Sequence, residues 1–399
     1  MTNSTVRAVN RLSRRWAAVQ PPAGDPSRDR GTVFTAAGVW PLLALLADGA
    51  DGAARGELAQ ALGVPAGAAA AAARELLDVL AGVRGLRAAT GLWARDDLPL
   101  QEAWSAKLPA GARGTLKGDA GADAKVLDAW ASERTGGLIE RMPVTLQEDT
   151  RLVLASALAL RLKWIRPFRE IPGGVDEGPW ADRLLPLLVR STSLLDRVRV
   201  AHGPAGPVTL LEVVGNTGVD VHLVLGEPGA PAGQTLAAAI DAVTRALPST
   251  GADLLPEGNP GPGLSVATVP AASPHPRLTV WTVAFDVRAE HDLLAQARLF
   301  GLETACDASH GHFPGVSADP LAVGSARQTA IARFGAEGFE AAAVTAVAAA
   351  AGCAPPRMRY RVRRAEVRFD RPFGFLAVHR TSRLVLAAGW VDEPATVCA

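Results

Sequence analysis

The sequence contains few cysteines, and those it has are far apart. Among its 399 residues are three cysteines, three methionines and one tyrosine. Cys306, Cys353 and Cys398 are odd in number and share no spacing with a disulfide framework or a zinc site. The composition therefore predicts neither a scaffold held by disulfides nor a metal site built on cysteine.

A strong net charge and a long apolar segment are also absent. Lys and Arg number 41 against 40 Asp and Glu, so the formal net charge of +1 predicts no attraction of the whole molecule to nucleic acid or to an anionic membrane. The basic N-terminal stretch is followed by no apolar segment, and no run is apolar enough to span a bilayer. We expect a soluble, cytoplasmic monomer, with export by another route left open.

Motifs of the common catalytic chemistries are missing as well. The chain contains no G-x-S-x-G, no H-E-x-x-H, no phosphate-binding G-x-x-x-x-G-K-[ST] and no strand-linked G-x-G-x-x-G. The nearest approach to a metal site is "CDASHGHF", with Cys306, Asp307, His310 and His312, but its spacing matches no common zinc site. We therefore predict no catalytic residue, no metal and no cofactor.

The chain does contain the apolar residues that a large core requires, since 48% of its residues are hydrophobic and 20% are charged. Residues 38–63 predict two helices joined by a Gly/Asp turn, and residues 68–83 predict a third. Residues 208–226 and 369–391 predict hairpins, and residues 278–302 predict a strand followed by a short helix. Helices early in the chain and strands late in it indicate an α+β fold.

Residues 336–352, "AEGFEAAAVTAVAAAAG", are nearly all small and form no apolar stripe. In a strand, successive side chains point to opposite faces. One face would then carry Phe339, Ala341, Ala343 and Thr345, and the other Gly338, Glu340, Ala342 and Val344. Such small side chains would let the strand slide between two existing strands with little displacement of the core. This composition suits a segment that starts exposed and later joins a sheet.

Four stretches, in order, resemble the serpin family and together run from Phe34 to Pro394. "FTAAGVWPLLALLADG" is similar to its early buried helix. "LDAWASERTGGLIERM", followed by "TRLVLASALALRLKWIRPF", is similar to a later helix and the long strand after it. "EGFEAAAVTA" resembles the hinge of the reactive-centre loop, and "FDRPFGFLAVHRTSRLVLAAGWVDEP" resembles the C-terminal signature. The chain as a whole resembles a bacterial-type serpin.

The resemblance implies a single domain, residues 1–399, with three β-sheets, about eight or nine helices and an exposed reactive-centre loop at about 338–356. It turns the apolar run at 150–164, whose length alone permits a helix, into a central strand of the largest sheet. It also implies a suicide substrate: a serine or cysteine protease cuts the loop, the hinge inserts into the sheet as a strand, and the attached protease is distorted. The alternative is a non-inhibitory relative, cut as a plain substrate or acting as a binding module.

The hinge departs from the family pattern at one position. The residues that the resemblance assigns to the hinge are Glu337, Gly338, Phe339, Glu340, Ala341, Ala342, Ala343 and Thr345. The family has Thr or Ser where this chain has Phe339. A bulky ring entering a close-packed interior costs about 1–3 kcal/mol, so the ring is expected to slow insertion and Phe339→Thr to speed it. The alternative is a slot that is locally enlarged.

Two bonds are candidates for cleavage. Counting from Gly338 as the family does places the reactive bond at Gly352–Cys353, although the stretch from there to "RPF" is longer than usual. The rival is Arg357–Met358, which would suit a trypsin-like protease, and the alanines between remain open. Cys353 itself is either a redox handle or simply a small residue.

Two further groups of residues belong to the predicted site: those at which the sheet opens, and the arginines between Arg357 and Arg364, here called the basic stripe. The resemblance assigns Trp164 to the breach, the top of the sheet where insertion starts. It assigns four residues to the shutter, the region where the sheet opens: Thr35, Gly38, Ser156 and Gln328. Where the family commonly has two serines, an asparagine and a histidine, these four are still small or polar, so the sheet is expected to open with altered stability. The arginines between Arg357 and Arg364 alternate with apolar residues, which predicts a strand. They form either a site for an anionic cofactor or a strand edge protected by charge.

Overall fold

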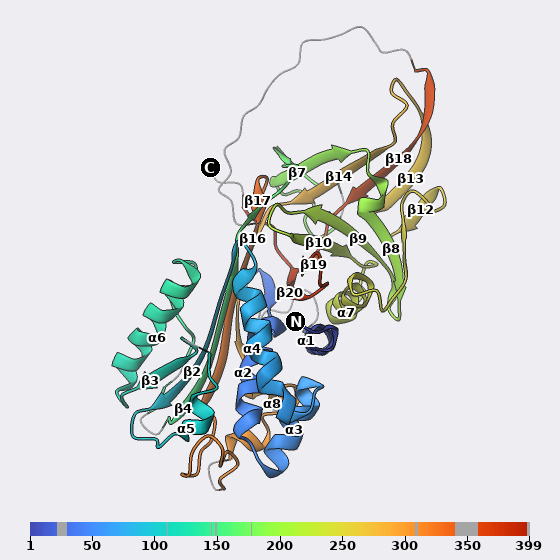
Figure 1. The fold of residues 1–399 in the computed structure, drawn as a ribbon. Helices are drawn as coiled ribbons and strands as arrows, with labels where there is room; N and C mark the ends of the chain where they lie inside the picture. The colour runs from blue at the N-terminus through green and yellow to red at the C-terminus, as the bar shows by residue number, and fades with distance from the viewer. Residues whose placement is uncertain are drawn as a thin grey trace.

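The computed structural model of the chain describes residues 1–21, 30–109, 111–144, 146–147, 150–176, 178–307, 310–339 and 358–396 (Figure 1). Three β-sheets and eight α-helices form from these residues, as the resemblance implied. Within this part of the chain, no helix combines the length and the hydropathy that crossing a bilayer requires.

The helices lie mostly in the first third of the chain. They are α1 (Asn3–Ala18), α2 (Ala36–Gly49), α3 (Gly52–Leu62), α4 (Ala66–Gly82), α5 (Glu102–Ser105), α6 (Ala120–Thr135), α7 (Ala232–Val243) and α8 (Ala297–Phe300), with short 3-10 turns η1 (Leu195–Arg197), η2 (Leu294–Gln296) and η3 (Thr304–Cys306). The Thr35 hydroxyl accepts a hydrogen bond from the Gly38 amide at the start of α2, and Gly63 ends α3 with a φ of 69°. The two helices and the connecting turn predicted for residues 38–63 are thus confirmed.

The largest sheet, here called the central sheet, holds the strand that the sequence left ambiguous. Its order is β3 (Arg113–Leu116), β2 (Leu86–Arg95), β4 (Leu152–Leu160), β16 (Ser325–Phe334), β17 (Gly338–Phe339) and β5 (Leu162–Lys163), and β15 (Phe285–Asp292) also pairs with β16. Figure 1 shows α6 on one side of β2 and β4 and the helices α2 and α4 on the other. Every residue of β4 is buried, because both faces of the strand are covered. That burial overrides the helical propensity of its Leu and Ala residues.

A second sheet is built from the two predicted hairpins. Its order is β1 (Gly31–Phe34), β20 (Val385–Val391), β19 (Phe373–His379), β10 (Val219–Leu225), β9 (Gly206–Val214), β8 (Val198–Gly203) and β11 (Ser249–Gly251). The pairs β9–β10 and β19–β20 are antiparallel, which confirms both hairpins. Helix α7 packs on this sheet and on α1.

The third sheet, here called the upper sheet, corrects two expectations. Its order is β12 (Gly258–Gly261), β13 (Leu264–Ala271), β18 (Tyr360–Arg368), β14 (Arg277–Val283), β7 (Leu185–Thr192) and β6 (Arg169–Gly173). The single strand expected at the start of residues 278–302 is two strands, β14 and β15, in different sheets. Only Ala284 separates them, so no Gly or Pro marks the break. The basic stripe lies on β18, which pairs with both β13 and β14 and is therefore not a strand edge.

Candidate functional site

The central sheet is closed along most of its length and parted at one end. Strands β4 and β16 pair in parallel over six residues each, Val153–Leu158 against Ser325–Ala330. Beyond that stretch β17 lies between β16 and β5, with Phe339 opposite Phe334 on one side and Leu162 on the other. We call the gap between β16 and β5 the slot. The first two hinge residues with a described strand conformation already fill it.

A tight turn brings the hinge into the slot. The Gly335 amide donates to the Gly338 carbonyl at 2.9 Å. The Trp164 indole Nε1 donates to the Gly335 carbonyl, and its backbone amide donates to the Glu337 carbonyl, both at 2.9 Å. A Cβ added to Gly338 would lie 2.1 Å from the Leu162 carbonyl oxygen, so only glycine fits there. Trp164 therefore lies at the start of the slot.

The ring of Phe339 is accommodated inside the fold. Its side chain is 2% exposed, and its ring centroid lies 6.2 Å from that of Phe375. Phe375 stacks on Phe285 at 5.0 Å, and Phe285 stacks on Phe334 at 5.2 Å. Trp164 completes this aromatic cluster, with its ring 4.9 Å from Phe334. The structure thus corresponds to the enlarged-slot alternative, since the aromatic cluster receives a ring where the family has a small side chain.

Shortening this side chain should weaken the intact fold. Because Phe339 is already buried, we expect Phe339→Thr to lose about 3 kcal/mol of unfolding free energy, within the range for large-to-small core changes. The midpoint of urea unfolding of the uncut protein measures this, with Phe339→Leu as a control that keeps most of the buried volume. An unchanged midpoint combined with faster inhibition would instead mean that the ring obstructs insertion.

The four predicted shutter residues meet beneath the closed part of the sheet. The Thr35 amide donates to the Gln328 side-chain oxygen at 2.8 Å, and the Gln328 side-chain amide donates to the Thr35 carbonyl at 2.9 Å. Gln328 pairs directly with Ser156 across β16 and β4. A Cβ on Gly38 would lie 2.6 Å from the Ser156 hydroxyl oxygen. That hydroxyl is buried and has no hydrogen-bond partner among the described residues.

Sequence reasoning missed a histidine at the shutter. His291 lies opposite Gln328 on β15, its Nε2 is 2.8 Å from the Val33 carbonyl oxygen, and its ring meets Trp16 edge-on at 5.1 Å. It joins β15 to β1 of the second sheet. Nothing in the run "RAEHDLL" signals this role, because it depends on a contact between distant segments.

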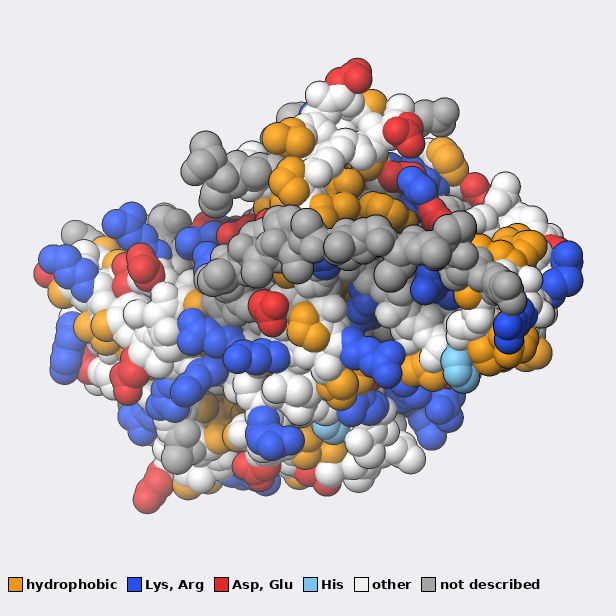
Figure 2. Space-filling model, turned by 90° about the horizontal axis from the view of Figure 1, so that it is seen from above, with side chains coloured by type: hydrophobic (Ala, Val, Ile, Leu, Met, Phe, Trp, Pro, Cys, Tyr) orange, Lys and Arg blue, Asp and Glu red, His pale blue; other side chains and the backbone are white. Residues whose placement is uncertain are grey.

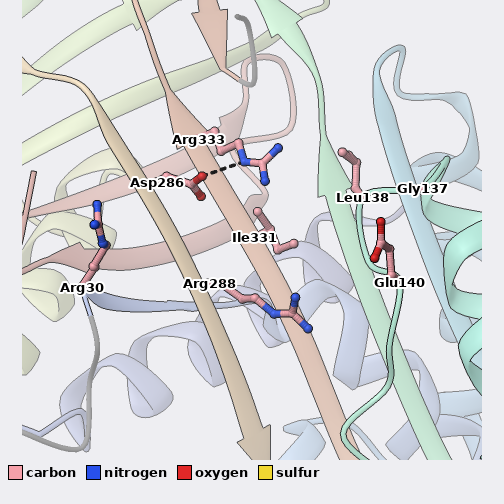
Figure 3. Close-up of a pocket in the computed structure, with 8 residues that line it drawn as sticks. All are labelled: Arg30, Gly137, Leu138, Glu140, Asp286, Arg288, Ile331 and Arg333. Carbon is pink, nitrogen blue, oxygen red and sulfur yellow. Dashed lines mark hydrogen bonds and ion pairs between the residues drawn. The ribbon is translucent and has the colours of Figure 1, made fainter. Parts of the chain in front are cut away.

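A cavity of about 550 Å³ opens on the other face of β16 (Figure 3). Leu138 and Glu140, from the segment after α6, face Ile331 and Arg333 of β16 across it, and Arg333 donates to Asp286 of β15 at 2.9 Å. Arg30, Gly137 and Arg288 complete the lining. The outer face of β16 is therefore open enough to receive a long side chain, whereas the inner face is packed.

Several predicted residues cannot be placed. Glu340, Ala341, Ala342, Ala343, Thr345, Gly352, Cys353 and Arg357 lie outside the described residues. Met358 is described and 62% exposed, and it lies two residues before Tyr360, the first residue of β18. Neither candidate bond is therefore located by the structure.

The basic stripe is partly neutralised by its surroundings. The Arg363 guanidinium donates to the carbonyls of Ala252 and Leu255, and Arg364 pairs with Glu366 at 3.0 Å. Figure 2, seen from above, shows many other Lys and Arg side chains on this face. Nearby, Arg190 lies 4.3 Å from the centre of the Phe168 ring, and burial lowers its pKa to about 10.

A separate cavity of about 280 Å³ lies between α7 and strands β8 to β10, and we call it the arginine pocket. Its charged lining consists of Arg197, Arg199, Arg245 and Arg383 with Asp196 and Glu212. His222, also in the lining, is 7% exposed, and burial lowers its pKa, so its ring is neutral at pH 7. Its buried Nε2 has no partner among the described residues. Four cations against two carboxylates favour an anion here.

The comparisons with known proteins agree with this geometry. A family model described as "Serpin (serine protease inhibitor)" matches residues 23–172 and 276–394. Thyroxine-binding globulin in complex with thyroxine is similar in structure, with a TM-score of 0.70 and 17% identity over 98% of this chain and 99% of that one. Serpin48 of the insect Tenebrio molitor gives 0.68 and 18% over 97% of each chain. Human glycosylated kallistatin gives 0.71 and 17% over 98% and 97%. No curated protein sequence matches.

Proposed function

The chain belongs to the serpin family, and from that premise we propose that it inhibits a serine or cysteine protease as a suicide substrate. Members of the family are generally inhibitors or binding proteins and not enzymes, and some do not inhibit. The observation that supports inhibition is β17, because two hinge residues already form a strand between β16 and β5. That the protein is a bacterial-type, cytoplasmic and monomeric member is part of the same proposal.

The register of β17 says where the rest of the loop would go. Phe339 lies opposite Phe334 on β16 and Leu162 on β5, and both pairings are antiparallel. Each step forward along the loop would therefore move one residue back along the strand on either side. The inward-facing partners would be Ala332 and Leu160 for Ala341, Ala330 and Leu158 for Ala343, and Gln328 and Ser156 for Thr345. The inserted strand would reach Ser325 at residue 348. A cut at Gly352–Cys353 leaves this whole stretch free to insert.

The same register pairs side chains of suitable chemistry. Thr345 would arrive beside Ser156, whose buried hydroxyl has no partner among the described residues and would gain one. On the outer face Glu340 would lie between Arg161 and Arg333, and opposite charges on neighbouring strands are stabilising. Small residues enter where Ala330 and Ala332 already pack, each 1% exposed. The loop sequence therefore fits the slot at each of these positions.

The proposed reaction traps an acyl-enzyme. The protease nucleophile attacks the carbonyl of the reactive bond, and the new amine end leaves with the segment that continues into β18. The other end, still esterified to the protease, is drawn along β16 as the strand forms. Deformation of the protease then prevents water from completing hydrolysis. The chain supplies no catalytic group, only the free energy of strand formation.

The alternative is a relative that is cut as a plain substrate or serves as a binding module. The arginine pocket favours binding, because its four arginines and the buried His222 suit a small anion. The name of one structural relative, thyroxine-binding globulin, shows that this fold also carries small molecules. An anionic cofactor acting on the stripe between Arg357 and Arg364 would be a further regulator of either function.

Incubation with a panel of serine and cysteine proteases tests the proposal. At least one protease is expected to give a covalent complex that survives SDS. Mass spectrometry should show that the released C-terminal fragment begins at Cys353. A fragment beginning at Met358 would move the reactive bond but keep the mechanism. Proteases that cut the loop and yet never form a complex would leave the plain-substrate alternative.

A further inference from the structure

The loop before β16 brings together Asp307, His310 and His312, three of the four side chains in "CDASHGHF", although the spacing of that stretch matches no common zinc site. Asp307 follows η3, and the His312 amide donates to the His310 carbonyl at 3.1 Å, which turns the chain back on itself. One ligand atom from each of the three residues lies within 4.8 Å of the others. This cluster is remote in sequence from the hinge and is not used by the proposed inhibition.

The distances in the cluster match those around a tetrahedral metal ion. The Asp307 Oδ2 is 3.5 Å from His310 Nδ1 and 3.4 Å from His312 Nε2. A tetrahedron with metal–ligand bonds of about 2.05 Å has edges of about 3.3 Å. The contact between His312 and Asp307 also meets the criterion for a hydrogen bond, but at 3.4 Å it is longer than charge-assisted hydrogen bonds of about 2.7–2.9 Å. The third edge, between the two histidine nitrogens, is at most 4.8 Å, and rotation of the exposed His310 ring would shorten it.

The surroundings hold this loop in place. The Glu57 carboxylate accepts from the Thr304 amide at 2.9 Å and from its hydroxyl. The Asp51 amide donates to the His312 carbonyl at 2.9 Å, and the Gly315 amide donates to Gly49 at 3.0 Å. Anchoring at both ends reduces the ordering cost of binding an ion.

The fourth residue of the sequence cluster takes no part. The Cys306 thiol donates to the Leu302 carbonyl at 3.2 Å, so it is directed away from the other three side chains and is not part of the group whose ligand atoms lie within 4.8 Å of one another. The ligand set is thus two imidazoles and one carboxylate, with solvent open to the fourth position because the His310 side chain is 76% exposed. Such a set suits Zn²⁺ and similar borderline ions over Mg²⁺ or Ca²⁺, which prefer all-oxygen sites.

We propose that Asp307, His310 and His312 form a site for a divalent transition metal ion, with Zn²⁺ as the expected occupant, that braces the segment leading into β16. The segment ends at Ser325, the first residue of β16, and the Val323 amide donates to the Ala305 carbonyl at 2.8 Å. Bound metal would therefore stiffen the base of the strand beside which the loop is proposed to insert. The site itself does not depend on inhibition.

Titration of the full chain, free of any affinity tag, with ZnCl₂ in a calorimeter tests the site. We expect one equivalent to bind with low-micromolar affinity, and the unfolding temperature to rise by roughly 3 °C at a hundredfold excess over the dissociation constant. The double variant His310→Ala/His312→Ala should bind at least tenfold more weakly. The matched control is His202→Ala/His275→Ala, which removes two exposed histidines elsewhere and should bind like the parent.

Co²⁺ serves as a spectroscopic probe of the ligands. A site of two nitrogens and one oxygen should give visible absorption without thiolate charge-transfer bands, and Cys306→Ser should leave the spectrum unchanged. Absence of saturable Zn²⁺ binding, or equal binding by the His310→Ala/His312→Ala variant, overturns the proposal. Thiolate bands would assign the metal to cysteine and overturn it as well. All variants should melt with the parent when no metal is added.

Discussion

Cutting the loop should raise the temperature of thermal unfolding by on the order of 15 °C. Residues 340–348 would join β16 on one side and β4 on the other, and this would replace one six-residue parallel pairing with two antiparallel ladders. About ten additional hydrogen bonds at about 1 kcal/mol each, with burial of the small side chains, give roughly 10–15 kcal/mol. Unfolding entropy of about 2.1 cal/mol/K per residue over 399 residues converts this to the stated shift.

Scanning calorimetry of cut and uncut protein measures the shift, with one fixed scan rate because the midpoint of an irreversible transition depends on the scan rate. Protein incubated with the same protease after the protease has been inactivated is the control. If the cut and uncut forms unfold at the same temperature, the loop does not insert, and the proposed inhibition fails with it.

Placing a charge on the inward face of the loop should abolish trapping. Ala343 would lie between Ala330 and Leu158, which are 1% and 2% exposed. In Ala343→Arg a guanidinium would have to enter this packed apolar layer unpaired, at a cost of several kcal/mol. Strand formation would stall after the first few residues, and hydrolysis would finish first. We expect the number of inhibitor molecules consumed per protease molecule to rise more than tenfold while the rate of loop cleavage stays the same.

The neighbouring position provides a matched control. Ala342 would face Ile331 on the outer side of the sheet, and Ile331 borders the 550 Å³ cavity that contains Glu140 and Asp286 (Figure 3). Arg30, Arg288 and Arg333 also line this cavity, but it has room for a long side chain and opens to solvent, so Ala342→Arg should trap protease nearly as well as the parent. Equal loss in both variants would show that the register read from β17 is wrong. Equal retention would show that the inner face is not packed against the loop.

The local patterns in the sequence predicted much of the fold. The α2–α3 pair followed from an apolar run, a turn and a glycine cap, and the two hairpins followed from turn residues between apolar runs. The strand β4 needed the family resemblance, since burial on both faces removes the alternation that identifies a strand. The break between β14 and β15 left no signal, because a single alanine separates strands of two different sheets.

The sequence could indicate the site residues that lie within recognisable motifs. It could not indicate contacts between segments that are far apart in the chain. Thr35, Gly38, Ser156 and Gln328, which the resemblance singled out, lie together in the structure, and their role in sheet opening stays a prediction. The placement of Phe339 could not be foreseen, because the room for its ring comes from Phe375 and Phe285, far away in the chain. His291 is of the same kind, because its place depends on a contact with Val33, far away in the chain. Such contacts are set by how sheets stack, which no short pattern encodes.

The position of Phe339 also sets the length of chain that a bound protease can pull on before it reaches a buried residue. The chain between Phe339 and Met358 comprises residues 340–357, and its contour length is at most roughly 65 Å. An enzyme that grips the middle of this tether can draw it taut without first extracting the buried ring. In the proposed inhibition, recognition of the loop by the protease and insertion of the loop into the sheet would therefore be mechanically separate, with the turn held by Trp164 as the fixed point between them.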